Sequence, residues 1–153
     1  MANVLGIIAE YNPFHNGHLY HLQKSKELTN SEFTVCVIGG NFTQRGSVSL
    51  IDKWTKTEMA LNNGADLVIE LPTIYNISSA ENFADGAIKI LNSLKIVDFV
   101  SFGSEVGNIN TLDNIAKVLV EEPKEYITML NHELSTRQFF SKGPRKGFII
   151  IFK

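Results

Sequence analysis

VLGIIAEYNPFHNGHLYHLQKSKEL, residues 4–28, begins with a short apolar run that predicts a buried parallel β-strand from Val4 to Ala9. Pro13 has no N–H group and holds Asn12 in an extended conformation, so the chain must leave the strand and turn over the end of the sheet. Helical periodicity follows the turn at once. The segment therefore predicts a strand, a tight turn and a helix in immediate succession.

Two histidines, His15 and His18, lie at the predicted start of this helix, where His15 or Asn16 is placed as the N-cap. The first turn of a helix exposes unpaired N–H groups and a partial positive charge, which favour phosphate oxygens. Two histidines three residues apart can both donate hydrogen bonds to a phosphate that gains charge, and Gly17 lets a ligand approach the backbone. The alternative is an ordinary pair of loop histidines, but the strand, turn and glycine context favours a phosphate site.

The alternation of strand and helix continues to about residue 134. It predicts an α/β fold, a Rossmann-like parallel sheet of four or five strands with helices on both faces. The first turn lacks G-x-G-x-x-G, which excludes the dinucleotide-binding pattern of dehydrogenases. The further strands are expected at Phe33–Gly39, Ala65–Leu71 and Val97–Phe102, and the further helices at Ser49–Asn63, Ser78–Leu94 (with a capping box of Ser78 and Glu81), Thr111–Glu121 and Pro123–Leu134.

The glycine turn after the second predicted strand is expected to lie beside the histidines, because the carboxyl ends of parallel strands meet at one edge of the sheet. Asn41, Gln44 and Arg45 would then face the same cleft. Arg45 has two interpretations, a contact to phosphate or RNA backbone and a solvated loop arginine. Gly103, after the fourth strand, is expected at the same edge.

Four side chains between these turns have less specific expectations. Trp54 is expected in the core, and Lys53 and Lys56 on a solvated helix face. Glu70 lies in an apolar strand, where a carboxylate needs a partner, so it is either a hydrogen-bond acceptor at the strand end or a site residue.

The composition is that of a globular protein: 153 residues, 44% of them hydrophobic and 20% charged, enough for one domain. The net charge of −2 neither supports nor excludes a nucleic-acid partner. Cys36 is the single cysteine, so a disulfide or thiolate cluster within the chain is excluded, and it is expected in the core. No apolar run approaches the roughly 20 residues of a membrane helix, and no basic leader is present, so a cytoplasmic protein without membrane contact is expected.

Five blocks of the sequence, in order, resemble the bacterial tRNA(Met) cytidine acetate ligase family. The H-N-G-H motif by itself resembles only the H-x-G-H signature of the nucleotidyltransferase superfamily, whereas the set of blocks is specific. The blocks are GIIAEYNPFHNGH (6–18), GNFTQRG (40–46), DKWTKTEMAL (52–61), GADLVIELP (64–72) and FGSE (102–105).

This resemblance implies an ATP-dependent ligase that activates acetate as acetyl-adenylate and acetylates N4 of the wobble cytidine, C34, of elongator tRNA(Met). It implies His15 and His18 as catalytic residues, and ATP with Mg²⁺, the ion being held mainly by the ATP phosphates. The tRNA contacts would lie mostly in a C-terminal part absent from this sequence. The implied ATP contacts are Ile7, Ile8, Ala9, Glu10, Tyr11, Asn12, Pro13, Phe14, His15, Asn16, Gly17, His18, Leu19, Tyr20 and Gly103, with Arg45 as a candidate phosphate or RNA contact.

The last residues depart from the pattern of the resembled family. Residues 1–134 are expected to form an ATP-binding domain, the N-terminal part of a longer architecture, and residues 135–153 a divergent tail outside the fold. Phe148–Phe152 is an apolar run of high β-propensity within this tail. The chain thus resembles a truncated or frame-shifted family member. Two alternatives stay open, a small adenylyl- or cytidylyltransferase of the same superfamily and an inactive fragment that at most binds ATP.

Overall fold

The computed structural model describes residues 2–104, 108–135 and 148–152. The chain divides into two compact units, residues 1–102 with 151–153 and residues 103–150. Among the described residues, no helix is both long and apolar enough to cross a membrane.

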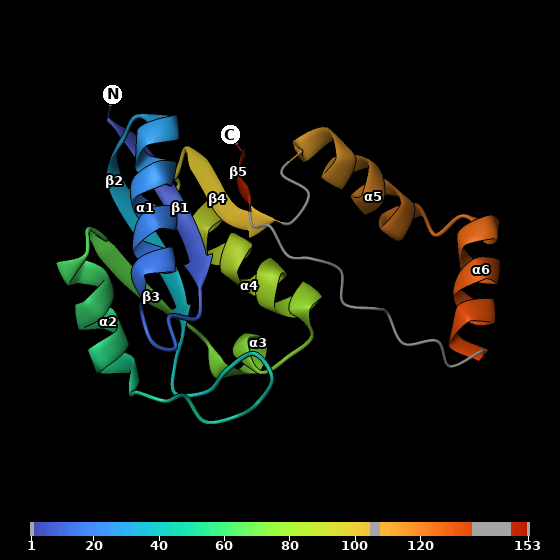
Figure 1. Ribbon diagram of the computed structural model, residues 1–153, viewed down its shortest axis with the longest axis horizontal. Helices are drawn as coiled ribbons and strands as arrows, with labels where there is room; N and C mark the ends of the chain where they lie inside the picture. Colours follow the sequence, from blue (N-terminus) through green and yellow to red (C-terminus); the bar gives the residue numbers. More distant parts are fainter. Residues whose placement is uncertain (1, 105–107, 136–147, 153) are drawn as a thin grey trace. The chain divides into compact units, whose positions relative to one another are not determined.

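The sheet of the first unit is built around its first strand, β1 (Asn3–Ala9), which lies between β2 and β4. Both neighbours are parallel to β1, and Ile7 pairs with Cys36 on one side and Ser101 on the other. The strand order is β3-β2-β1-β4-β5 (Figure 1). This confirms the predicted α/β fold with a parallel sheet. The other strands are β2 (Ser31–Gly39), β3 (Leu67–Leu71), β4 (Phe99–Ser104) and β5 (Phe148–Phe152).

Alternate residues of the strands pack against helices on opposite faces of this sheet. Leu5 and Ile7 are fully buried on the face covered by α1 (Asn16–Thr29) and α2 (Lys53–Asn62). The two helices contribute Leu22 and Ala60 to that core, respectively.

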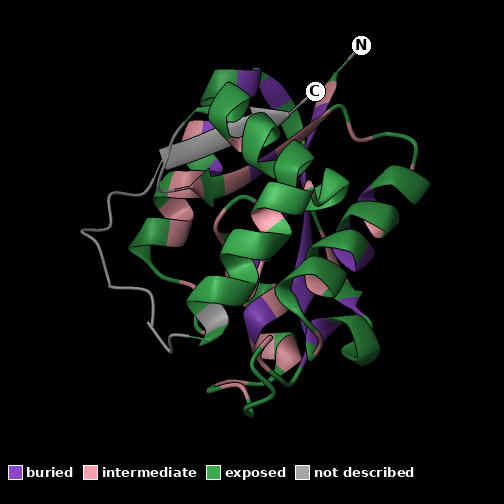
Figure 2. Ribbon diagram, turned by 90° about the vertical axis from the view of Figure 1, so that its right-hand side faces the viewer, coloured by how far each residue is buried: buried purple, intermediate pink, exposed green. Residues whose placement is uncertain are grey.

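The opposite face packs on α4 (Ala80–Ser93), whose Ala87 and Leu91 belong to the same buried cluster as Val35 and Val37 of β2. A short helix, α3 (Thr73–Asn76), precedes α4 and was not predicted. Figure 2 shows the buried residues gathered along the strands. The period-two alternation of the strands thus produces two cores, as expected for a sheet covered on both faces.

Helix α2 differs from its prediction in both its start and its orientation. It begins at Lys53 because the Asp52 carboxylate caps it, accepting from the N–H groups of Trp54 at 2.9 Å and Thr55 at 3.0 Å. Trp54 is 70% exposed, so its expected place in the core is wrong. Lys56 is fully buried, so its expected solvation is also wrong. The helix is rotated from the predicted orientation, with Lys56 and Ala60, one turn apart, facing inward.

The N-cap of α4 is Ser79, whose hydroxyl accepts from the Asn82 N–H at 3.2 Å. The predicted capping box of Ser78 and Glu81 is therefore wrong by one residue. Ser78 lies just before the cap, and its hydroxyl binds the Asn82 side-chain amide at 2.9 Å instead.

The second unit contains α5 (Ile109–Glu121) and α6 (Lys124–Ser135), close to the predicted ranges. The cap of α5 is Asn108, whose side chain accepts from the N–H groups of Asn110 and Thr111, so the helix begins two residues before the predicted start.

The tail contains a strand, β5, although residues 135–153 were expected to lie outside the fold. Its run of aliphatic and aromatic residues has high β-propensity, and β5 takes the edge position beside β4. Residues 136–147 and 153 of the tail, and Glu105 of the FGSE block, lie outside the described residues. The division of the chain at residue 134 stays a prediction.

Replacing Leu22 with alanine should destabilise the first unit by about 2–5 kcal/mol, because this side chain is 1% exposed within the core between α1 and the sheet. Leu28 on the same helix is 55% exposed, and Leu28→Ala should cost less than about 0.5 kcal/mol. Urea unfolding of both variants measures the difference. Equal losses of stability would contradict this assignment of the buried face of α1.

Candidate functional site

The turn between β1 and α1 ends in a reciprocal cap made by two imidazoles. Nδ1 of His15 accepts from the Gly17 N–H at 3.1 Å, and Nδ1 of His18 accepts from the His15 N–H at 3.3 Å. This is the geometry of a capping box, with histidines in place of the usual serine and glutamate. Of the two N-cap candidates, His15 is thus the cap and Asn16 is the first helical residue.

The cap determines which nitrogen of each ring can donate to a ligand. Because both Nδ1 atoms accept hydrogen bonds, the neutral rings carry their proton on Nε2. Neither Nε2 atom of His15 and His18 has a hydrogen-bond partner among the described residues. The rings stack with their centroids 3.7 Å apart. The structure therefore brings the two histidines together and leaves an N–H donor on each.

His18 is packed among aromatic rings, which sets its charge. The ring centroid of Tyr11 lies 4.9 Å away and that of Phe14 lies 5.6 Å away. Burial, followed by the neighbouring His15 and His21, lowers the pKa of His18 from 6.5 to about 4. At neutral pH the His18 ring is thus uncharged. It can donate a hydrogen bond through its N–H group, but it has no extra proton to transfer.

The backbone N–H groups of this first turn are less available than predicted. The His18 N–H donates to the His15 carbonyl at 2.8 Å, and the Gly17 N–H is bound by the His15 ring. The expectation of unpaired N–H groups is therefore wrong at these two positions. An anion at this helix end would meet the imidazole Nε2–H groups rather than these amides.

The absence of a side chain at Gly17 serves the cap directly. A Cβ atom there would lie 2.9 Å from Cε1 of His15. A larger residue would displace the ring that caps the helix, so Gly17 is required for the stacking itself, whatever its role toward a ligand.

The glycine-containing loop after β2 is hydrogen-bonded to the histidine turn at two points. The Gln44 N–H donates to the Glu10 carboxylate, and the Leu50 N–H donates to Oδ1 of Asn12 at 2.7 Å. The predicted meeting of these two turns at one edge of the sheet is therefore confirmed for Gln44. Arg45 is exposed and has no ion pair or hydrogen bond within the described residues, so its contact to phosphate or RNA stays a prediction.

The remaining predicted site residues differ in accessibility. Ile7 and Tyr11 are buried, so a ligand could reach only their backbone, and the Tyr11 hydroxyl lies 3.7 Å from Sγ of Cys36 in the core, as predicted for that cysteine. Gly103 is exposed near the end of β4. The ATP contacts of all these residues stay predictions. Among the others, Pro13, Asn16 and Tyr20 are exposed, and Ile8, Ala9, Glu10, Asn12, Phe14 and Leu19 are half-buried.

A polar contact between α1 and β4 was not predicted from the sequence. Nε2 of His21 lies 2.9 Å from the Ser101 hydroxyl, which lies 2.7 Å from the hydroxyl of Ser25. Ser25 and Ser101 are fully buried, so this chain of groups orients the helix on the sheet. The spacing of His18, His21 and Ser25 along one helix face was the available signal.

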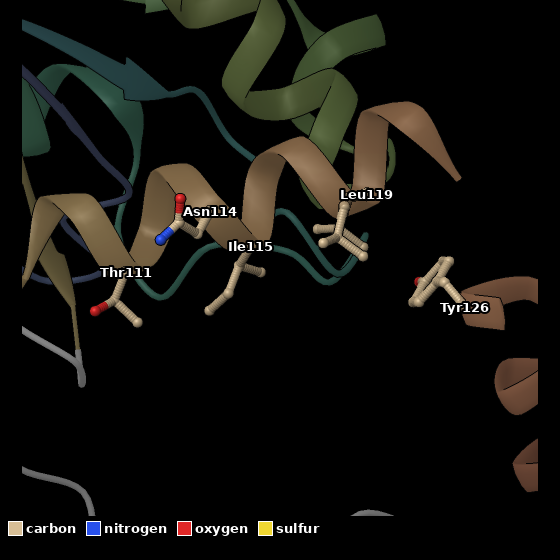
Figure 3. Close-up of a pocket in the computed structure, with 6 residues that line it drawn as sticks. Thr111, Asn114, Ile115, Leu119 and Tyr126 are labelled. Atoms are coloured by element: carbon tan, nitrogen blue, oxygen red, sulfur yellow. The ribbon is translucent and has the colours of Figure 1, made fainter. Parts of the chain in front are cut away.

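The second unit contains a cavity of about 370 Å³ between α5 and α6 (Figure 3). Tyr126 is the only titratable residue of its wall, and no acid–base pair is present there. The cavity contains none of the predicted site residues and has no recognisable chemistry. Its wall consists of Thr111, Asn114, Ile115, Val118, Leu119 and Tyr126.

A family profile and individual relatives both match this chain over most of its length. The profile of the HIGH nucleotidyl transferase family matches residues 2–148. The tRNA(Met) cytidine acetate ligase of Thermoanaerobacter sp. (strain X514) is 59% identical over 140 residues, covering 92% of this chain and 35% of that protein. The protein of the same name from Clostridium botulinum (strain Langeland) is 56% identical over 147 residues, covering 96% and 36%. This chain thus spans about a third of the length of these relatives.

Solved structures agree with the sequence matches. The crystal structure of Thermotoga maritima TmcAL without ligand has a TM-score of 0.81 and 45% identity, covering 90% of this chain and 33% of that one. The same protein bound with alpha-thio ATP has a TM-score of 0.80, with the same identity and coverage.

The low pKa of His18 predicts a specific pH dependence of stability. Between pH 6.5 and about 4 the unfolded chain binds a proton at this residue and the folded chain does not, so the free energy of unfolding should fall as the pH falls through this window. His18→Gln, which can keep the reciprocal cap, should reduce this slope. Urea unfolding across this pH range measures the slope, and an NMR titration midpoint of His18 above 6.5 would contradict the prediction.

Proposed function

Because this chain belongs to the HIGH nucleotidyl transferase family, we propose that it binds ATP and forms the adenylate-forming part of a tRNA(Met) cytidine acetate ligase. The names of its relatives and the alpha-thio ATP complex of T. maritima TmcAL support this proposal. The observation that carries it is the reciprocal imidazole cap, which leaves two Nε2–H donors side by side at a helix N-terminus.

The proposed first step joins acetate to ATP. A carboxylate oxygen of acetate attacks the α-phosphorus, the bond from this phosphorus to the bridging oxygen breaks, and pyrophosphate leaves. Negative charge accumulates on the bridging oxygen and the pyrophosphate. Donors that are already oriented toward this charge stabilise the transition state more than the bound substrate.

His15 and His18 suit this role because the cap fixes both rings before ATP arrives. Their Nδ1 atoms are occupied by backbone N–H groups, so the rings cannot turn without breaking the helix cap. The low pKa of His18, about 4, keeps this ring neutral at physiological pH. We therefore assign it the role of a neutral hydrogen-bond donor, not of a general acid, and no covalent protein intermediate is needed.

In the proposed second step, the acetyl group passes to the N4 amine of cytidine 34 of elongator tRNA(Met), which yields N4-acetylcytidine and AMP. Arg45, exposed on the loop that contacts the histidine turn, is the proposed phosphate or RNA contact of this chain. The reaction would take place in the cytoplasm, where tRNA and ATP are available.

Mg²⁺ is proposed to arrive on the ATP phosphates and to screen their charge. Among the described residues, no group of three or more His, Cys, Asp or Glu side chains could hold a metal ion. In this proposal the ion is held mainly by the ATP phosphates.

Replacing either histidine tests this function. His15→Asn and His18→Gln keep side chains that can cap the helix, so the fold should survive. The acetate-dependent exchange of labelled pyrophosphate into ATP should fall by about 10²-fold or more, because a donor aimed at developing charge is lost. The affinity for ATP should change much less.

The control is His132→Ala, on the exposed surface of α6, which should leave the exchange rate unchanged. Histidine variants that retain the parent's rate within about threefold would remove the histidines from the mechanism. Pyrophosphate release with phosphopantetheine instead of acetate would favour the alternative, a small adenylyltransferase.

Valine at Gly17 or Gly103 should weaken ATP binding. At Gly17 the added side chain would displace the His15 ring, which lies 2.9 Å from the position of a Cβ atom. At Gly103 it would obstruct the proposed contact between backbone and nucleotide. Calorimetry measures the affinities, and circular dichroism checks that the variants fold. Unchanged affinity in both variants would place the nucleotide elsewhere.

A further inference from the structure

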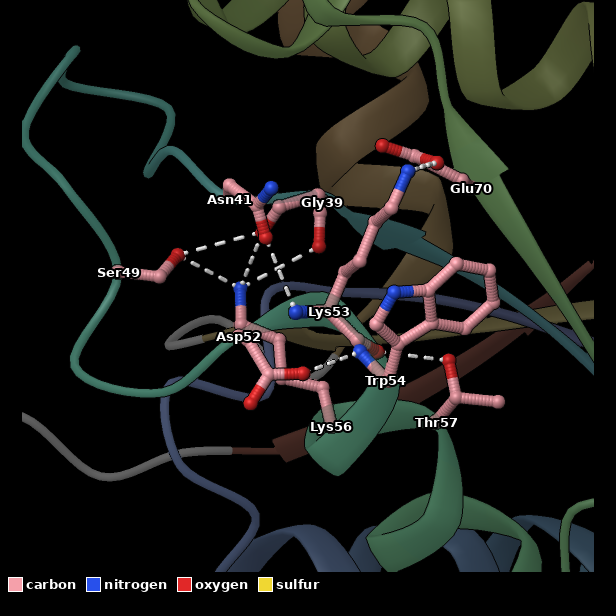
Figure 4. Close-up of polar contacts among 10 residues, drawn as sticks. Gly39, Asn41, Ser49, Asp52, Lys53, Trp54, Lys56, Thr57 and Glu70 are labelled. Carbon is pink, nitrogen blue, oxygen red and sulfur yellow. Dashed lines mark hydrogen bonds and ion pairs between the residues drawn. The ribbon is translucent and has the colours of Figure 1, made fainter.

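Lys56 is a fully buried lysine whose ammonium group is completely hydrogen-bonded. Its Nζ donates to the carbonyl of Gly40 at 2.8 Å, to the hydroxyl of Ser49 at 2.8 Å and to the carbonyl of Gly39 at 3.3 Å (Figure 4). An ammonium group has three donors, so these acceptors use all of them. A buried charge is tolerated only when it is paired or hydrogen-bonded, so these three acceptors offset the cost of burying the ammonium group.

The three acceptors lie at the two ends of one loop. Gly39 and Gly40 begin the loop at the end of β2, and Ser49 lies near its other end. Two further hydrogen bonds join the same ends, since the Ser49 N–H donates to the Asn41 carbonyl at 2.9 Å and the Ser49 hydroxyl to the Gly40 carbonyl at 3.3 Å. Lys56 therefore closes the loop of residues 40–49 from inside the protein.

The start of this loop is also enclosed by side chains. A Cβ atom at Gly39 would lie 2.5 Å from Oδ1 of Asn76, and one at Gly40 would collide with the Glu70 carboxylate. Glu70 is held by an ion pair with Lys53 at 2.7 Å, which identifies the partner that this strand carboxylate needs. The glycine turn thus cannot shift toward either side chain, and its carbonyls stay directed at Lys56.

The closed loop in turn contacts the histidine turn. Between its clamped ends it carries Gln44, whose N–H binds Glu10, and just after Ser49 it carries Leu50, whose N–H binds Asn12. Burial lowers the pKa of Lys56, and the charge of the Glu10 carboxylate opposes that effect. The turn and the loop are therefore coupled by both hydrogen bonds and charge.

We propose that Lys56 is a positioning residue of the site. By clamping both ends of the loop of residues 40–49, it holds Gln44 and Leu50 against Glu10 and Asn12, and so orients the turn that carries His15 and His18. The clamp itself follows from the contacts above, and its effect on ATP rests on the proposed function.

The test compares Lys56→Met with Lys89→Met in the 153-residue chain. Methionine is close to lysine in length but cannot donate to the three acceptors. Lys89 lies on the exposed face of α4, paired with Asp85 at 2.6 Å, so its replacement is the matched control. Ser49→Ala removes one acceptor of the clamp and serves as a milder variant if Lys56→Met does not fold.

The first measurement is the rate of trypsin cleavage after Arg45, followed by mass spectrometry below the unfolding transition. Arg45 lies in a turn closed by the Gly46 N–H to the Thr43 carbonyl at 2.9 Å, and a protease needs an opened segment. Lys56→Met should raise this rate by at least about tenfold, since hydrogen bonds to a charged group are lost. Ser49→Ala should raise it less, and Lys89→Met should not change it.

The second measurement is the affinity for ATP, which should fall by about tenfold in Lys56→Met and stay unchanged in Lys89→Met. If Lys56→Met accelerated trypsin cleavage equally at all lysine and arginine sites, Lys56 would have a purely structural role and the proposal would be overturned. Unchanged cleavage after Arg45 would also overturn it. ATP binding by Lys56→Met as tight as by the parent would overturn the effect on the site, while the proposed function stands. A parent chain that does not bind ATP would refute the proposed function, while selective cleavage would still establish the clamp.

Discussion

The central position of β1 is the constraint on which the rest of the structure depends. β1 pairs in parallel with β2 and β4, and Leu5 and Ile7 are fully buried under α1 and α2. A strand covered on both faces and both edges cannot shift its register without exposing its apolar side chains. The residues that follow β1 are therefore held at the carboxyl edge of the sheet, where the loop after β2 also begins. This constraint holds the H-N-G-H motif of residues 15–18 in a defined position beside the loop after β2.

In the cap of α1, the imidazoles of His15 and His18 both stabilise the helix and provide the proposed hydrogen-bond donors for the ligand. A helix N-terminus usually offers its N–H groups to an anion, but here the ring and carbonyl of His15 bind those of Gly17 and His18. The hydrogen-bond donors that remain available to an anion are therefore the Nε2–H groups of the two imidazoles rather than these backbone N–H groups. Packing of His18 against Tyr11 keeps one of these donors neutral, because a charged ring would lose solvation. The proposed catalytic groups are thus already oriented by the folding of the helix.

Buried polar groups give the edge of the sheet its specific shape. Lys56 and Asn76 are buried beside the Gly39–Gly40 turn, where an apolar residue would pack with less cost of desolvation, and the exposed Glu70 carboxylate lies against Gly40. An apolar side chain at position 56 would leave the buried carbonyls of the turn without a donor. The polar contacts therefore determine one conformation of the loop, and through Glu10 and Asn12 they bear on the histidine turn.

The sequence by itself determined the α/β class and the β1–turn–α1 segment, and it limited the cap of α1 to His15 or Asn16, because these features depend on local periodicity and on residues a few positions apart. It also located the meeting of Gln44 with the histidine turn, since parallel strands end at a common edge. Only the tertiary structure decided that Lys56 faces inward and Trp54 outward. The acceptors that make a buried lysine stable come from Gly39, Gly40 and Ser49, and no helical pattern within residues 53–62 reveals them. The strand at residues 148–152 depends in the same way on an edge of the sheet that distant residues provide.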